Sequence, residues 1–347
     1  MAMNKLENVN ISEIKPIISP EKLKSSLKIS EPIANFVIES RETISNIIQG
    51  KDKRLLVIVG PCSIHDPKGA FDYATRLAPL VKKYSDKLYI VMRVYFEKPR
   101  TNIGWKGLIS DPNLNGTNDI EKGITTARNV MLEILSKKIP TGSELLDPIL
   151  PQYYADLICW ASIGARTSES QTHREMASGL SMPIGFKNAT DGNIDVALHG
   201  IQAANHAHSF IGVTQSGTIG RVTSNGNPDA HLILRGGANG PNYSSVQMEE
   251  HIEKIAKAKL ITRLLVDCSH GNSRKKAENQ NKVLNSILNQ IENGNTKIFG
   301  VMIESFLNHG NQSISDVPLT YGTSVTDECI GWEETEQLLE TVHKRLS

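Results

Sequence analysis

The chain has 347 residues, of which 39% are hydrophobic and 22% charged, and its 38 Lys and Arg residues nearly balance its 37 Asp and Glu residues. This is the composition of a globular protein, and a net charge of +1 excludes a generally basic nucleic-acid-binding protein. No apolar run approaches the ~18 residues of a membrane span, so we expect neither nucleic acid nor membrane as a partner.

The first residues and the cysteines indicate where the protein works. Residues 1–10 are polar and mixed in charge, without the apolar stretch of a secretory signal. The four cysteines lie far apart, and no two form a CxxC pair; they are Cys62, Cys159, Cys268 and Cys329. This spacing argues against a disulfide framework and predicts a reducing, cytoplasmic location.

Residues 1–50 are predicted to form an arm ahead of the main domain. From about Ile33 to Gln49 apolar residues recur at helical spacing, and Gly50 follows as a stop signal. We expect this helix either to cover one end of the next domain or to contact another subunit.

Residues 51–347 alternate short apolar runs with helix-like segments. The expected strands are Leu55–Val59, Leu88–Val94, Thr141–Leu145, Leu157–Ile163, Met182–Phe186, Ser209–Val213 together with His231–Leu234, Leu264–Val266 and Ile298–Ile303. The expected helices are Gly69–Lys83, Asp119–Lys138, His173–Gly179, Ile194–His206, Met248–Lys259 and Ala277–Glu292. Apolar strands alternating with helices are typical of a parallel sheet buried on both faces.

The number of repeats favours one fold class. Counting Ser209–Val213 and His231–Leu234 as one interrupted strand gives eight units, which predicts an α/β fold of the (β/α)8 TIM-barrel class. A doubly wound sheet is the alternative, but no GxGxxG follows the first strand, which disfavours its dinucleotide-binding version.

A β-hairpin is expected within the insertion at about residues 209–235. The segment 210–214, the turn-like Gln215-Ser-Gly217 and the segment 218–223 have the pattern of two strands and a tight turn. Such an insertion is either neutral decoration or one wall of a regulatory pocket.

Ionisable groups or soft ligands stand at or just after the end of every predicted strand. In chain order they are Cys62, Arg93, Glu144, Arg166, Lys187, Arg235, His270 and Glu304. The carboxyl ends of barrel strands meet at one mouth, where active sites of this fold lie. The sequence therefore predicts a functional site built from all eight units.

The cations of this set predict an anionic ligand. Arg93, Lys98, Arg100, Arg166, Lys187 and Arg235 all belong to the predicted mouth. Arg suits bidentate binding of carboxylate or phosphate, and Lys acts as a point charge. Gly164-Ala165 and Gly236-Gly237 add backbone N–H donors that can approach a phosphate. We expect a ligand with more than one anionic group.

The remaining residues suggest a metal site. Cys62, His270, Glu304 and Asp327 combine a thiolate, an imidazole and two carboxylates. Such a mixed set suits Mn²⁺, Fe²⁺, Zn²⁺ or Co²⁺ better than Mg²⁺ or Ca²⁺. The spacing of these four residues in the sequence does not by itself indicate a metal site, because only the fold of the barrel would bring them together.

Several long motifs resemble the class I 3-deoxy-D-arabino-heptulosonate 7-phosphate (DAHP) synthases. They are the segments Gly60–Asp66, Arg93–Thr101, Gly104–Pro112, Gly164–Gln171, Gly185–Asn188, Leu234–Gly237, Asp267–Asn272 and Gly322–Trp332. The resemblance covers essentially the whole chain from the arm onward. It implies the first step of the shikimate pathway, in which phosphoenolpyruvate condenses with erythrose 4-phosphate and water to give DAHP and phosphate.

The resemblance also implies residue roles. Phosphoenolpyruvate would be held by Arg93, Lys98, Gly164, Ala165, Arg166, Lys187 and Arg235, and erythrose 4-phosphate by Pro99, Arg100 and Thr101. The metal at Cys62, His270, Glu304 and Asp327 would act as a Lewis acid on the aldehyde oxygen. Lys98, with neighbouring cations expected to lower its pKa, is the candidate proton donor, and Glu144 the candidate base for water.

Feedback inhibition by an aromatic amino acid is implied as well. The effector cleft would include Asp147, Pro151, Gln152, Leu180, Phe210 and Gly212, closed by the arm of a neighbouring subunit in a homodimer or homotetramer. The chain resembles the tyrosine-sensitive branch most. Gly212, where phenylalanine-sensitive members tend to have serine, leaves room for the phenolic hydroxyl of tyrosine.

Two other functions are compatible with parts of this pattern. A metal-dependent phosphosugar aldolase would share barrel, metal and phosphate sites but needs fewer cations. A non-catalytic sensor of phosphate ligands would have lost metal ligands or Lys98, and all of these are present.

Overall fold

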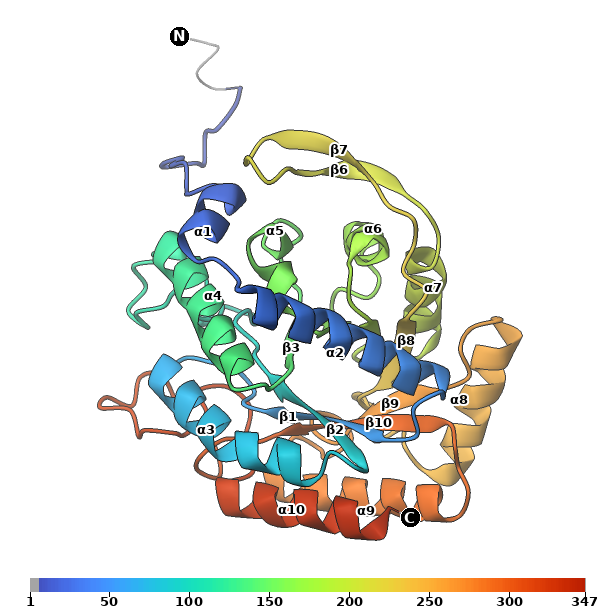
Figure 1. Cartoon of the computed structure of the whole chain (residues 1–347). Coiled ribbons are helices and arrows are strands. Elements are labelled where there is room, and N and C mark those ends of the chain that lie inside the picture. Colours follow the sequence, from blue (N-terminus) through green and yellow to red (C-terminus); the bar gives the residue numbers. More distant parts are fainter. Residues whose placement is uncertain (1–5, 347) are drawn as a thin grey trace.

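The computed structural model describes residues 6–346, so the first five residues of the predicted arm lie outside it. Eight parallel strands close into a barrel in the order β1-β10-β9-β8-β5-β4-β3-β2, with helices around it (Figure 1). The strands are β1 (Leu55–Gly60), β2 (Leu88–Arg93), β3 (Thr141–Glu144), β4 (Trp160–Ile163), β5 (Ile184–Lys187), β8 (Ala230–Leu234), β9 (Leu264–Asp267) and β10 (Ile298–Glu304). The predicted (β/α)8 barrel is confirmed.

All but the last of the outer helices in residues 6–346 follow the strands as the periodicity predicts, and the last was not predicted. They are α3 (Pro67–Lys83), α4 (Ile120–Ser136), α6 (Gln171–Gly179), α7 (Asp195–Ala204), α8 (Ser245–Lys257), α9 (Gln280–Glu292) and α10 (Trp332–Arg345). Short pieces add α5 (Pro151–Tyr154) and 3-10 turns at Ala155–Leu157 and Ala277–Asn279. In α9, for example, Val283, Leu284, Ile287 and Leu288 form the buried stripe that packs on the barrel.

The predicted interrupted strand is wrong. Only β8 belongs to the barrel, where it pairs with β5 and β9. Ser209–Val213 is β6, which pairs antiparallel with β7 (Ile219–Thr223) in a separate hairpin. The physical reason is the burial pattern: every residue of β8 is buried, whereas Ile211 and Ile219 of the hairpin are 83% and 80% exposed. The predicted hairpin itself is confirmed.

Helix α2 (Glu31–Gln49) closes the N-terminal end of the barrel. Its Arg41 donates hydrogen bonds to the carbonyls of Ile158, at 2.9 Å, and Ala155, at 2.6 Å, just ahead of β4. Gln49 donates to Asp229, just ahead of β8. Gly50 ends the helix in a left-handed conformation, at φ 78°. The structure therefore bears out a helix that covers one end of the domain.

Helix α1 (Pro20–Ser26) lies against the tip of the hairpin (Figure 1). The N–H of Glu21 donates to the carbonyl of Gln215 at 2.8 Å, and Lys24 Nζ donates to the Gln215 side chain at 3.0 Å. Buried Arg128 of α4 holds the next segment through the Leu27 carbonyl. The arm and the hairpin are thus joined within one chain. Among residues 6–346, no helix is both long and apolar enough to span a bilayer.

Candidate active site

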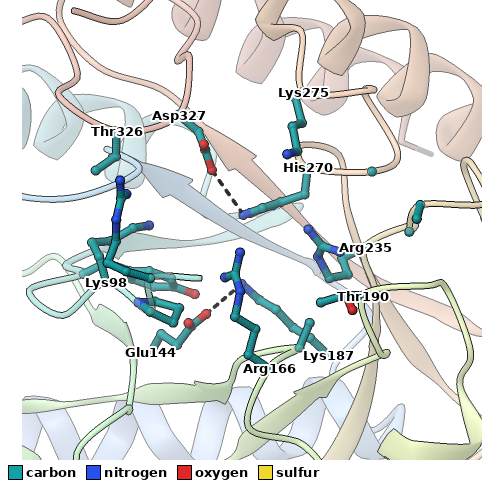
Figure 2. A pocket seen from close by; sticks show the side chains of 17 residues that line it. Lys98, Glu144, Arg166, Lys187, Thr190, Arg235, His270, Lys275, Thr326 and Asp327 are labelled. Carbon is teal, nitrogen blue, oxygen red and sulfur yellow. Dashed lines mark hydrogen bonds and ion pairs between the residues drawn. The ribbon is translucent and has the colours of Figure 1, made fainter. Parts of the chain in front are cut away.

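A cavity of about 290 Å³ opens at the carboxyl ends of the strands (Figure 2). Eleven of the residues singled out from the sequence line it, and they come from strand ends and loops all round the barrel: Lys98, Pro99, Arg100, Glu144, Ala165, Arg166, Lys187, Arg235, Gly237, His270 and Asp327. Arg93 and the metal candidates Cys62 and Glu304 are buried. Cys62 is hydrogen-bonded to Lys98, Glu304 faces His270, and Arg93 lies over the ring of Tyr95, and these three partners line the cavity. The predicted mouth is therefore one connected site.

The floor of the cavity holds a buried ion pair. Lys187 Nζ lies 2.8 Å from Glu144 Oε2 and 3.9 Å from Asp267 Oδ2. Burial alone would raise the pKa of Glu144, but Lys187 and Lys98 outweigh it and lower that pKa to about 2. Burial works against the charge of Lys187 too, yet Glu144 leaves its pKa raised. Both groups are therefore charged at neutral pH.

Arg93 is a fully buried cation beside this pair. Its guanidinium donates to Glu304 Oε1 at 3.0 Å and lies 3.9 Å above the ring of Tyr95. Lys187 and Lys98 also face this ring, at 5.5 and 5.9 Å. Three cations thus lie close to one aromatic ring, an arrangement that partly offsets their desolvation. Tyr95 was not predicted, although its place two residues after Arg93 could have suggested the same orientation.

The rim carries more exposed cations. Arg166 is exposed, and its Nε donates to Thr101 Oγ1 at 3.1 Å, which links the loop after β4 to the loop after β2. Arg100 is exposed as well, and Arg235 is half-buried on the opposite side. Figure 2 shows Arg166, Arg235, Lys187 and Lys275 around one space.

The cavity includes residues that the sequence did not reveal. Lys275, Thr190 and Thr326 line it in addition to Tyr95. Lys275 follows His270 by five residues, and its N–H donates to the His270 carbonyl at 2.7 Å. Its place in a loop without periodicity gave no signal beyond its charge.

Three of the predicted metal ligands form a compact group. One ligand atom each from Cys62, Glu304 and Asp327 lie within 4.8 Å of one another. His270 is adjacent, with Nε2 at 3.7 Å from Glu304 Oε1 and 3.9 Å from Asp327 Oδ2. The soft thiol, imidazole and carboxylates fit a divalent transition metal.

The surroundings of this group support that use. Burial and the charge of Glu304 raise the pKa of Cys62 to about 12, so the thiol remains protonated until a cation displaces its proton. His270 Nδ1 approaches Asp267 Oδ2 within 2.9 Å without the alignment of a hydrogen bond. A carboxylate behind the imidazole directs the other ring nitrogen toward a metal, as in many metalloproteins. Ser269 Oγ holds the second oxygen of Glu304 at 2.7 Å.

The expected lowered pKa of Lys98 is wrong. Burial acts in that direction, but Cys62, Glu304, Asp327 and Glu144 outweigh it, and the pKa of Lys98 is raised. Its Nζ donates to Cys62 Sγ at 3.1 Å and to the Cys62 carbonyl at 3.2 Å. The acidic groups around Lys98 thus outweigh both its burial and the cations of the site. Lys98 carries its proton at neutral pH.

The predicted effector residues lie around the hairpin and α5. Gln215 at the hairpin tip donates to Gln152 at 2.6 Å. A Cβ on Gly179 would lie 4.0 Å from the ring of Phe210, so the residue preceding Leu180 faces the hairpin. Asp147 accepts from the N–H of Ile149 ahead of Pro151. A Cβ on Gly212 would lie 2.8 Å from Val222 Cγ2, so a side chain there displaces that methyl group. These contacts place the residues at the hairpin side of the barrel.

The chain matches the family model described as "DAHP synthetase I family" over residues 27–340. The Tyr-sensitive phospho-2-dehydro-3-deoxyheptonate aldolase of Escherichia coli K12 is 49% identical and aligns with 100% of this chain and 98% of its own length. The Phe-sensitive enzyme of E. coli K12 is 50% identical, with 96% of this chain and 95% of its own length covered. The structure of phospho-2-dehydro-3-deoxyheptonate aldolase from Francisella tularensis SCHU S4 superposes with a TM-score of 0.95 at 49% identity, covering 97% of this chain and 98% of the other.

The chain therefore belongs to the DAHP synthetase I family. It is an enzyme of the first step of the shikimate pathway, which joins phosphoenolpyruvate to erythrose 4-phosphate. The comparisons favour this activity over the phosphosugar aldolase and the non-catalytic sensor. The two E. coli relatives are equally similar to this chain, so overall identity does not select its effector.

Proposed function

We propose that the cations on the floor and far wall of the cavity bind phosphoenolpyruvate. Arg93, Lys98, Lys187, Arg166 and Arg235, with the Gly164-Ala165 backbone, would take its carboxylate and phosphate. The observation that carries this assignment is the convergence of buried Lys187 with rim cations on one cavity of about 290 Å³, with buried Arg93 directly behind the lining residue Tyr95. A Cβ at Gly164 would lie 2.7 Å from Glu144 Oε1, so a larger residue there would push into the ion pair.

Erythrose 4-phosphate would enter over the loop that carries Pro99, Arg100 and Thr101. Arg100 and Thr101 are exposed at the rim, where a phosphate remains partly hydrated. The bond from Arg166 to Thr101 joins the two substrate regions, so the aldehyde end can reach the enol carbon of phosphoenolpyruvate.

The metal-binding set would be Cys62, His270, Glu304 and Asp327, with Mn²⁺, Fe²⁺, Zn²⁺ or Co²⁺ as occupant. When bound, the metal supplies a Lewis acid for the aldehyde oxygen. Lys98, beside Cys62 and carrying its proton, is placed to protonate the alkoxide that forms as C3 of phosphoenolpyruvate attacks the aldehyde. Glu144 is ionised, but a carboxylate with a pKa of about 2 is a weak base. We therefore assign it the orientation of the water that adds at C2, before phosphate leaves by C–O cleavage.

A phosphate-release assay tests the activity. We expect release only when both substrates and a divalent metal are present. Release from phosphoenolpyruvate alone, or from both substrates without metal, would contradict the proposal. Alanine at Arg93 or Arg235 should raise KM for phosphoenolpyruvate, and alanine at Arg100 should raise KM for erythrose 4-phosphate. If alanine at Arg93 or Arg235 instead raised KM for erythrose 4-phosphate, and alanine at Arg100 raised KM for phosphoenolpyruvate, the assignment of the two subsites would be reversed.

Tyrosine is the proposed feedback inhibitor, in the cleft that includes Asp147, Pro151, Gln152, Leu180, Phe210 and Gly212. The absence of a side chain at Gly212 leaves room for a phenolic hydroxyl. Initial rates at sub-saturating phosphoenolpyruvate should fall with tyrosine more than with phenylalanine or tryptophan, and Gly212→Ser should shift the preference toward phenylalanine. Gly220→Ser, opposite Gly212 on β7, is the matched control for hairpin damage. Inhibition of the unaltered enzyme by phenylalanine but not tyrosine would refute the assignment.

A homodimer or homotetramer in the cytoplasm is the proposed working form. The neighbouring subunit's arm would close the effector cleft, and the four buried cysteines are free thiols, as expected in a reducing compartment. Sizing of the chain with and without residues 1–50 tests the role of the arm. An unchanged oligomer after removal of the arm would contradict it.

A further inference from the structure

Three buried asparagines surround the loop that carries Arg235. Asn188 follows β5, Asn242 precedes α8, and Asn272 follows β9; their exposures are 0%, 5% and 3%. None of them lines the cavity. They connect to one another, because Asn242 Nδ2 donates to Asn188 Oδ1 at 3.1 Å and the Asn242 N–H donates to Asn272 Oδ1 at 3.0 Å.

These asparagines occupy every backbone polar group from the Leu234 carbonyl to the Gly236 carbonyl. Asn272 Nδ2 donates to the Leu234 carbonyl at 3.1 Å, and its N–H donates to the Arg235 carbonyl at 3.2 Å. The N–H of Arg235 donates to Asn188 Oδ1 at 2.7 Å, and the N–H of Gly236 donates to Asn242 Oδ1 at 2.8 Å. Asn188 Nδ2 completes the set by donating to the Gly236 carbonyl at 3.0 Å.

Asparagine chemistry suits this position because the amide both donates and accepts. Asn188 uses its oxygen twice and its NH₂ twice, the latter toward Ala189 and Gly236. Aspartate would lose the donors and place a buried charge against carbonyl oxygens. Gly236 completes the fit: its φ is +66°, and a Cβ there would lie 2.5 Å from the Asn272 nitrogen. The loop therefore has one conformation, fixed from outside the cavity.

We infer that Asn188, Asn242 and Asn272 are positioning residues that hold Arg235 in register for the anionic substrate. The inference depends on the proposed binding of phosphoenolpyruvate by Arg235. An interaction present equally in ground and transition states affects KM rather than kcat. Loosening the loop should therefore weaken phosphoenolpyruvate binding selectively, because Arg100 and Thr101 lie on a different loop.

Asn242→Ala is the test, since residue 242 belongs to a segment without any proposed binding residue. We expect KM for phosphoenolpyruvate to rise about tenfold, the equivalent of one lost hydrogen bond. KM for erythrose 4-phosphate and kcat should stay within about twofold. Asn227→Ala is the matched control. Asn227 is also buried but does not line the cavity, and its Nδ2 donates hydrogen bonds to the carbonyls of Ala177, Leu180 and Met182. It should lower the Tm and leave KM for phosphoenolpyruvate unchanged.

Arg235→Ala distinguishes the binding role of Arg235 from the positioning role of the three asparagines. If it raises KM for phosphoenolpyruvate and folded Asn242→Ala does not, the positioning role is refuted while the binding role stands. If Arg235→Ala leaves KM unchanged, the binding role and this inference both fall. Equal rises in both KM values for Asn242→Ala, matched by Asn227→Ala, would show a merely structural role and also refute the inference. If Asn242→Ala does not fold, Asn242→Ser, whose shorter side chain also withdraws the acceptor from the Gly236 N–H, is measured in the same way and should show the same selective rise.

Discussion

The two ends of the barrel differ in the kind of polar group that they bury. At the mouth, the ionisable side chains of Arg93, Lys187, Glu144 and Glu304 are almost completely buried. At the opposite end, under α2, the polar pair is neutral: Trp160 Nε1 donates to His231 Nε2 at 3.2 Å, and His231 packs edge-on against Phe299. Burial lowers the pKa of His231 to about 4, so the imidazole carries no charge at neutral pH.

The difference separates function from stability. Buried charges are costly to desolvate and contribute little net stability even when paired, so the mouth keeps them for its ligands. A neutral hydrogen-bonded pair inside aromatic packing stabilises the fold without attracting a ligand. Changes at the mouth that keep its buried charges paired should therefore alter activity with small effects on unfolding, and changes at the other end should do the reverse.

The largest effect should come from removing the metal. Chelation is expected to abolish activity and added Mn²⁺ to restore it, while the Tm of the folded chain changes little. Cys62→Ser should weaken metal binding, because an alcohol is a poorer ligand for these metals than a thiolate. Cys159→Ser is the control, since Cys159 is equally buried but lies at the opposite end, next to β4. Full activity after verified removal of metal would contradict the metal site.

The next effect concerns Lys98. Lys98→Arg should lower kcat by about 10²–10⁴, the range for loss of a general acid, because the planar guanidinium cannot present a proton at the position that Lys98 Nζ holds beside Cys62. Lys297→Arg, half-buried at the other end of the barrel, is the control and should leave kcat unchanged. A near-normal kcat with a raised KM for Lys98→Arg would leave Lys98 only an electrostatic role.

The smallest predicted effect concerns His231, at the end of the barrel opposite the mouth. The pKa of His231 is about 4 when folded and about 6.5 when unfolded, so as pH falls the unfolded chain takes up the proton first. The free energy of unfolding should therefore decrease between pH 6.5 and 4, by on the order of 3 kcal/mol. His231→Gln, which keeps an acceptor for Trp160 but does not titrate, should lose this pH dependence and retain kcat.

Denaturant unfolding at several pH values measures that difference. His199→Gln, an exposed histidine on α7, serves as the control and should follow the pH dependence of the unaltered chain. Parallel curves for His231→Gln and the unaltered chain would show that His231 does not control the acid sensitivity of the fold.

The sequence predicted the barrel because its buried strands are nearly continuous apolar runs that end in charged residues. It did not separate β6 from β8, since both segments are apolar and only pairing distinguishes a hairpin from a barrel strand. Helix α10 was not predicted, although Leu338, Leu339 and Val342 have helical spacing and are buried in the structure.

The electrostatics of the site were less predictable than its residues. The sequence shows which charges Lys98 has in its loop, but the pKa depends on Glu304 and Asp327, which come from the other end of the chain. The sequence did not reveal the positioning role of the asparagines around Arg235 either, because nothing in it distinguishes an asparagine that will be buried from one in a surface turn. Side-chain roles that depend on partners far away in the chain require the structure.

The pairing of β1 with β10 has a consequence for biosynthesis. Leu56 lies beside Gly300, so the ring of strands stays open until the ribosome has added a further 244 residues after Leu56. At ~5–20 residues per second, that interval lasts roughly 12–50 s. During this interval the edge of β1 that later pairs with β10 is unpaired. The apolar stripe of α2, with Ile44, Ile47 and Ile48, also lacks part of its final cover. The nascent chain is therefore most exposed to aggregation and to chaperone capture at its oldest end, where synthesis began.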